Sequence, residues 1–69
     1  MSTAEARELT GQFGEITVNG TIYRKELHVF IREAKEGEVR LERLEGVDIF
    51  VKARDIVDFK QKKAPVLTL

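Results

Sequence analysis

Alternation of apolar and polar residues dominates this chain and predicts short β-strands. Val39 and Leu41 alternate with polar neighbours, and Leu44 follows near an expected bulge. Residues 47–53 repeat the pattern, and the apolar members of that run are Val47, Ile49, Val51 and Ala53. An alternation of period two is typical of a strand with one buried face.

The stretch IFVKARDIVDFKQKK, residues 49–63, raises the question of whether the chain ends in one strand or two. The apolar pattern dips at residues 53–55 and returns at Ile56, Val57 and Phe59. We therefore predict two strands joined by a short turn, followed by a polar tail.

The pair Asn19-Gly20 predicts a tight β-hairpin between residues 16–18 and 21–23. Both central residues of a type I′ turn need a positive φ, and Asn-Gly is the preferred pair. The predicted register runs from Val18 opposite Thr21, through Ile16 opposite Tyr23, to Glu15 opposite Arg24. The last pair has opposite charges, which stabilise cross-strand pairing.

Residues 26–36 fit two kinds of secondary structure. With period two, Leu27, Val29 and Ile31 share a face, whereas with period 3.6 a helical stripe ends at Gly37. We favour a strand over 26–32 and a polar turn over 33–38, because Val, Phe and Ile are strand-forming residues. A helix over 26–36 would instead make the fold α+β.

The pattern as a whole predicts one mostly β domain. Ser2 and Glu5 have the spacing of a helix-capping box, so residues 1–10 are either a short helix or a frayed arm. About five short strands with turn signals over residues 11–60 predict a small antiparallel barrel. Residues 61–69 form a C-terminal tail.

Size and cysteine content suggest how such a domain is stabilised. The chain has 69 residues and no cysteine, which excludes disulfides and thiolate metal sites. Domains this small often rely on partner subunits, so we expect a homo-oligomer. No apolar run approaches the ~20 residues of a membrane-spanning helix, and the N-terminus lacks the apolar core of a signal peptide. We expect a cytoplasmic protein without a membrane partner.

Catalytic residue types are scarce. Ser2 is the only serine and lies at the terminus, and His28 is the only histidine. His28 lies within a predicted strand, which favours a structural position on its half-exposed face, and one histidine without cysteine argues against zinc. Asp48, Asp55 and Asp58 are expected to form surface ion pairs with Lys52, Arg54 and Lys60. We expect no enzyme, no cofactor and no metal.

Charge is balanced overall, with 12 basic and 12 acidic residues, but is sorted along the chain. Residues 52–63 carry five cations against two carboxylates, a local net charge of +3. Cations beside Phe50, Phe59 and Tyr23 suit a phosphate backbone with stacked bases. The predicted RNA-binding or single-stranded DNA-binding residues are Lys52, Arg54, Lys60, Lys62 and Lys63. Alternatively, these lysines are solvated and keep an edge strand from pairing.

The acidic half of the charge pattern supports a second hypothesis. Residues 33–45 carry five glutamates against three cations, a local net charge of −2. An acidic surface on one subunit meeting a basic surface on the next would support a head-to-tail ring. The end PVLTL also suits strand addition to a neighbour. An oligomerising adaptor would bind a protein through an apolar patch or open edge near Phe50, Phe59 and the tail.

The segment Val51-Lys52-Ala53-Arg54-Asp55-Ile56 resembles the Sm-like family, which includes Hfq, over roughly residues 13–59. That family has a short helix and five strands, and its last two strands flank an apolar-Arg-Gly-Asn-x-apolar turn. Here Lys52, Ala53 and Arg54 replace the Arg, Gly and Asn, and REAKEGE does not supply the family's Asp/Asn base-contacting loop. The resemblance implies a subunit ring with RNA at its pore through Lys52 and Arg54. Small barrels of SH3 type match the same spacing.

Overall fold

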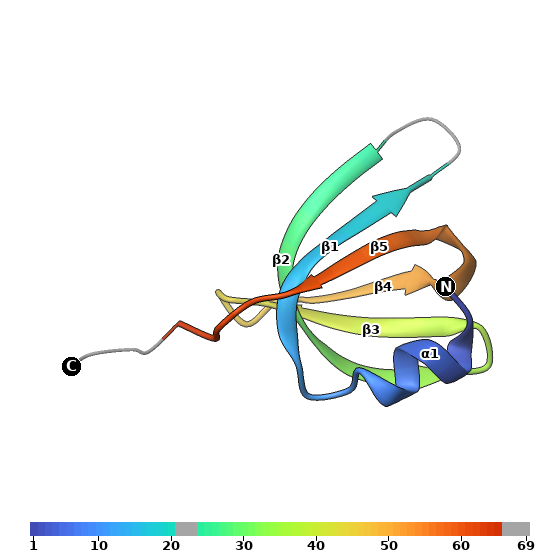
Figure 1. The fold of residues 1–69 in the computed structure, drawn as a ribbon, viewed down its shortest axis with the longest axis horizontal. Coiled ribbons are helices and arrows are strands. Elements are labelled where there is room, and N and C mark those ends of the chain that lie inside the picture. The colour runs from blue at the N-terminus through green and yellow to red at the C-terminus, as the bar shows by residue number, and fades with distance from the viewer. Residues whose placement is uncertain (21–23, 66–69) are drawn as a thin grey trace.

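The computed structural model describes residues 1–20 and 24–65 and contains one antiparallel five-stranded sheet behind a short helix (Figure 1). The elements are α1 (Thr3–Glu8), β1 (Phe13–Asn19), β2 (Arg24–Lys35), β3 (Glu38–Arg43), β4 (Asp48–Lys52), the 3-10 helix η1 (Ala53–Asp55) and β5 (Ile56–Gln61). The strand order is β4-β3-β2-β1-β5. The mostly β, five-stranded prediction is confirmed. The sheet is not closed between β4 and β5, so the predicted barrel is not confirmed.

Helix α1 begins with the predicted capping box. The Ser2 hydroxyl accepts a hydrogen bond from the Glu5 backbone N–H at 3.1 Å, and the Glu5 carboxylate accepts one from the Ser2 N–H at 3.2 Å. Hydrogen bonding to the Glu5 carboxylate, from the Ser2 backbone N–H first and the Ser2 side chain second, lowers the pKa of that carboxyl because it favours the ionised form. Ala6 is buried, and Thr3 accepts a hydrogen bond from Gly37. Residues 3–8 therefore form a docked helix instead of a frayed arm.

Strands β1 and β2 pair as predicted, but the predicted register is wrong. Asn19 lies opposite Arg24 and Glu15 opposite His28, so the Glu15–Arg24 pair does not occur. The observed register sets Ile16 opposite Leu27 and Gly14 opposite Val29, four residues along β2 from the predicted pairing. Because four is an even number, the same residues share the core face in both registers. What changes is the neighbour of each residue, and Leu27 and Val29 now lie beside β1. The predicted partners Thr21, Ile22 and Tyr23 lie outside the described residues.

Strand β2 settles the ambiguity of residues 26–36. The segment is strand up to Lys35, so the helical alternative is wrong, and the strand extends into the predicted turn over 33–38. The turn is confined to Glu36 and Gly37, which both have positive φ. Because Glu33, Ala34 and Lys35 pair with β3, tertiary pairing overrides the helical composition of Arg-Glu-Ala-Lys-Glu.

The core lies on the concave side of the bent sheet, and α1 covers one end of it (Figure 1). Its fully buried large side chains are Ile16, Val29, Ile31, Val39, Leu41 and Ile56. Ile49, Val51 and Phe59 pack against its rim and stay partly exposed, because they lie on the two edge strands. Val47 was expected on the buried face but is exposed, since β4 begins only at Asp48.

Two further predictions concern the C-terminal half. The chain does form two strands at residues 48–61, separated by η1, whose Ala53 is buried. The bulge expected near Leu44 is wrong. The pairing of β2 with β3 does contain a register shift, but it lies between Ile31 and Glu33 of β2. Leu44 belongs to the β3–β4 turn.

Candidate binding surface along strand β4

The predicted basic residues lie in two groups. Lys52 precedes η1 and Arg54 lies within it, close to the N-terminus of the chain, whose amino group donates a hydrogen bond to the carbonyl of Ile56. Lys60, Lys62 and Lys63 lie at the opposite end of β5, where the chain leaves the sheet (Figure 1). At a rise of ~3.3 Å per residue, β5 separates the groups by about 20 Å. The fold therefore does not gather the five cations on one compact face.

None of these five cations forms an ion pair within residues 1–20 and 24–65. By contrast, Arg32, Arg40 and Arg43 are all paired with carboxylates. The cross-strand neighbour of Lys52 is Glu38, and that of Lys60 is Glu15. Each group of cations thus remains open to an anion but has a carboxylate on the adjacent strand.

His28 is exposed on the convex face, as the sequence predicts for a structural histidine. Its Nε2 lies 3.5 Å from a Glu15 carboxylate oxygen, and its ring is stacked 6.4 Å from that of Phe13. In the part of the chain that the structure describes, no three residues of metal-binding type come together. The same part contains no helix with the length and hydropathy required to span a membrane.

The three aspartates do not pair as predicted. Asp48 lies 3.5 Å from the guanidinium of Arg40, a residue of β3, instead of pairing with Lys52, Arg54 or Lys60. The reason is the β3–β4 register, which brings Arg40 and Asp48 onto the same face. Within the described ranges, Asp55 and Asp58 form no ion pair.

In a second charged cluster on the convex face, the charged groups are paired with one another. The guanidinium of Arg32 lies 4.3 Å from the centre of the Phe30 ring and donates to Glu42 at 2.7 Å. Phe30 in turn packs 4.9 Å from Phe13. Because Arg32 already has a carboxylate and an aromatic ring as partners, we interpret this cluster as a structural feature and not as a binding site.

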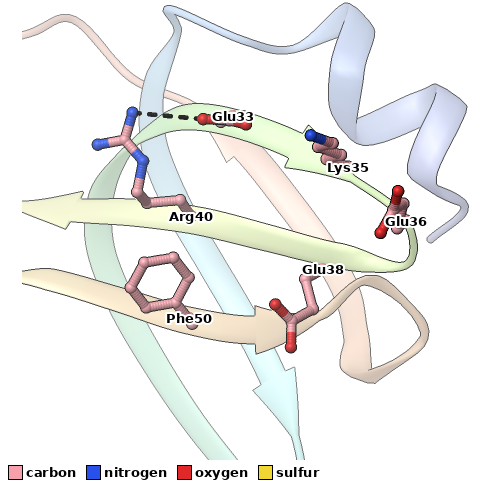
Figure 2. Close-up of a pocket in the computed structure, with 6 residues that line it drawn as sticks. All are labelled: Glu33, Lys35, Glu36, Glu38, Arg40 and Phe50. Atoms are coloured by element: carbon pink, nitrogen blue, oxygen red, sulfur yellow. Dashed lines mark ion pairs between the residues drawn. The ribbon is translucent and has the colours of Figure 1, made fainter.

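A shallow hollow of about 500 Å³ lies on the convex face next to β4. Its lining residues are Glu33, Lys35, Glu36, Glu38, Arg40 and Phe50. Figure 2 shows Phe50 standing on β4 beside Arg40, whose guanidinium is held 3.8 Å from Glu33. Phe50 is 64% exposed, more than any other large hydrophobic residue among those described. An exposed aromatic ring therefore stands at the sheet edge among charges that are largely paired.

The backbone of β4 has a defined orientation at this edge. Arg43 donates to the carbonyl of Val47, and Ala53 donates to the carbonyl of Gly37. In an antiparallel ladder, hydrogen-bonded pairs alternate with non-bonded pairs. Ile49 and Val51 therefore bond to β3, and the N–H and C=O groups of Asp48, Phe50 and Lys52 point to the free edge.

The other free edge, that of β5, is protected. Its pairing with β1 contains a register shift, and Lys60, Lys62, Lys63 and Pro65 follow in and after the strand. Bulges, lysines and proline are the usual means of preventing edge-to-edge association. Strand β4 has no bulge and no proline, and its register with β3 is regular throughout. It is the more receptive edge.

Sequence reasoning located Phe50 and an open edge but missed Arg40, Glu33 and Glu38. The alternating runs at residues 39–42 and 47–53 could have indicated this cluster, since a tight turn at residues 44–47 sets Arg40 opposite Phe50. Comparisons of this chain with protein-family models, curated proteins and solved structures find no match.

Proposed function

We propose that this chain is a non-enzymatic interaction module that accepts a β-strand from a protein partner at the free edge of β4. The observation that carries the proposal is the combination of a receptive edge with the exposed ring of Phe50. Strand addition gains affinity from main-chain hydrogen bonds and specificity from alternate side chains.

The side chains of β4 specify what the added strand should carry. In an antiparallel addition, the residue opposite Phe50 lies on the convex face and should be apolar or aromatic. A basic residue suits the position opposite Asp48, and an acidic residue the position opposite Lys52. The residues between them face the half-buried side chains of Ile49 and Val51 and should be apolar.

A short peptide tests this specificity. We expect the blocked peptide Glu-Val-Phe-Val-Lys to slow amide hydrogen exchange at Asp48, Phe50 and Lys52, measured by NMR on labelled protein. Protection at Ile49 and Val51 should change little, because their N–H groups already bond to β3. The charge-reversed peptide Lys-Val-Phe-Val-Glu is the matched control and should bind more weakly. The proposal is wrong if both peptides slow amide exchange equally, or if the protection is confined to β5.

Nucleic-acid binding is a second candidate, supported by the five cations that have no ion-pair partner in the described residues. The cluster Lys60, Lys62 and Lys63 predicts about three phosphate contacts, and a slope of about −0.7 per contact lowers affinity for single strands roughly 20-fold between 50 and 200 mM salt. Fluorescence anisotropy with a labelled oligouridine measures this. Lys62→Glu should weaken binding, whereas Lys35→Glu on the β2–β3 side should not. Binding that ignores salt would eliminate the candidate.

We also retain the Sm-like or SH3-like barrel as a proposal for the fold type. It is supported by the five-strand order and by η1, which occupies the position of the tight turn in the resemblance. In that proposal, a ring would use both free edges of the sheet, and Lys52 and Arg54 would face its pore.

A further inference from the structure

We infer that the partner strand is β4 of a second copy of this chain, in a two-fold symmetric antiparallel dimer centred on Phe50. The inference rests on the proposed function, since it uses the same free edge. It goes further by naming the occupant, the symmetry and the register.

The sequence of β4 is complementary to itself in this arrangement. Reading Asp48-Ile49-Phe50-Val51-Lys52 against its own reverse sets Phe50 opposite Phe50 of the second copy. Asp48 then lies opposite Lys52 of the second copy, and the reciprocal pair follows by symmetry. Ile49 lies opposite Val51 of the second copy. Every position is therefore matched in charge or hydropathy. The two Asp48–Lys52 pairs are equivalent by the two-fold symmetry, and each is a favourable cross-strand contact.

Backbone geometry permits this register. The groups that face the free edge belong to Asp48, Phe50 and Lys52, and the two-fold operation pairs these residues only with one another. All six residues of the two strands that point outward can thus exchange hydrogen bonds. A register shifted by one residue on each strand would pair Asp48 with Phe50 and leave Lys52 beyond the end of the partner strand. Only the centred register pairs all five residues.

The contact also covers surface that the single chain leaves exposed. The Phe50 rings would meet at the two-fold axis on the convex face, and the half-buried Ile49 and Val51 of each copy would join the two cores. Lys52 would lie between its own neighbour Glu38 and Asp48 of the second copy. Asp48 already faces Arg40, which also faces Glu33. A five-residue strand pair is a small interface, so we expect a reversible dimer.

Charge reversal provides the decisive test. In a homodimer of either single variant, Asp48→Lys or Lys52→Asp, two pairs of like charges lie opposite each other. Each variant should therefore raise the dimer dissociation constant at least tenfold. A mixture of the two variants restores both opposite-charge pairs and should form a heterodimer with wild-type affinity, and so should a homodimer of the D48K/K52D double variant. Native mass spectrometry and analytical ultracentrifugation measure these species. Val57→Asp, on the β5 edge, is the control and should dimerise normally.

A cysteine cross-link tests the register directly, because the chain has no cysteine of its own. Hydrogen-bonded residues in an antiparallel pair have Cα atoms about 5.5 Å apart, within the range for a disulfide. Phe50→Cys should therefore form an intermolecular disulfide under mild oxidation much faster than Val57→Cys.

The outcomes separate this inference from the proposed function. Heterodimer rescue and the selective Phe50→Cys cross-link support it. A chain that stays monomeric at millimolar concentration while still binding the Glu-Val-Phe-Val-Lys peptide overturns the dimer and leaves the proposed function intact. A chain that stays monomeric and also does not bind the peptide overturns both the dimer and the proposed function. A mass of six or seven subunits, with equal cross-linking at both positions, overturns the dimer in favour of the ring.

Discussion

Replacing Gly14 by alanine is expected to detach β5 from β1 and largely unfold the domain. Gly14 lies opposite Gln61 in the β1–β5 pair. A Cβ atom at this position would lie 2.3 Å from the carbonyl oxygen of Lys60 and 2.7 Å from the Phe59 ring. The backbone atom cannot move away without breaking the ladder, so the expected loss is about 3 kcal/mol or more. A domain of this length has about 3–10 kcal/mol of stability in total.

Urea unfolding measures the effect, with Gly46→Ala as the control. Gly46 has a φ of +90°, and a Cβ there meets nothing within 4 Å. Its replacement therefore adds only left-handed backbone strain, about 1–2 kcal/mol. If Gly14→Ala were no more destabilising than Gly46→Ala, close packing of β5 on Gly14 would be wrong.

Truncating Ile31 to alanine is expected to be the second large effect. Ile31 is fully buried in the central strand β2, opposite Leu41 of β3. Removing a buried side chain of this size costs about 2–5 kcal/mol, through lost transfer energy and the cavity left behind. In a domain this small, such a loss lowers the melting temperature by about 10–30 °C. Differential scanning calorimetry or thermal circular dichroism measures it.

Leu44→Ala is the matched control for this prediction. Leu44 has a side chain of the same size but is 56% exposed in the β3–β4 turn. Its truncation should change the free energy of unfolding by about 0.5 kcal/mol or less. Comparable losses at Ile31 and Leu44 would contradict the observed core.

The fold class followed from local patterns, because a period-two alternation needs no knowledge of the partner strand. Val39 and Leu41 were predicted to face inward and are fully buried. The capping box of Ser2 and Glu5 was likewise predictable, since both groups lie within one helical turn. The register of β1 with β2 was not, because the Asn19-Gly20 signal is local and the alignment of Ile16 with Leu27 and of Gly14 with Val29 is not.

The candidate surface was predictable only in part. Exposure of Phe50 and an open edge strand were expected near the C-terminal half, and the structure has both. The pairing of Arg40 with Glu33 and Asp48 was missed, because it joins three strands whose registers the sequence does not state. The functions hypothesised from Lys52, Arg54, Lys60, Lys62 and Lys63 stay predictions for the experiments above.

The sequence alone indicated a mostly β domain with about five short strands, a helix-capping signal at Ser2 and Glu5, and a polar break between its last two strands. These features depend on contacts between near neighbours in the chain. Only the tertiary structure decided which strands are edges, how β1 is aligned with β2, that residues 3–8 form a docked helix, and that the basic residues fall into two groups. Strand order and register depend on burying a whole sheet face at once, and that energy is a property of the assembled core.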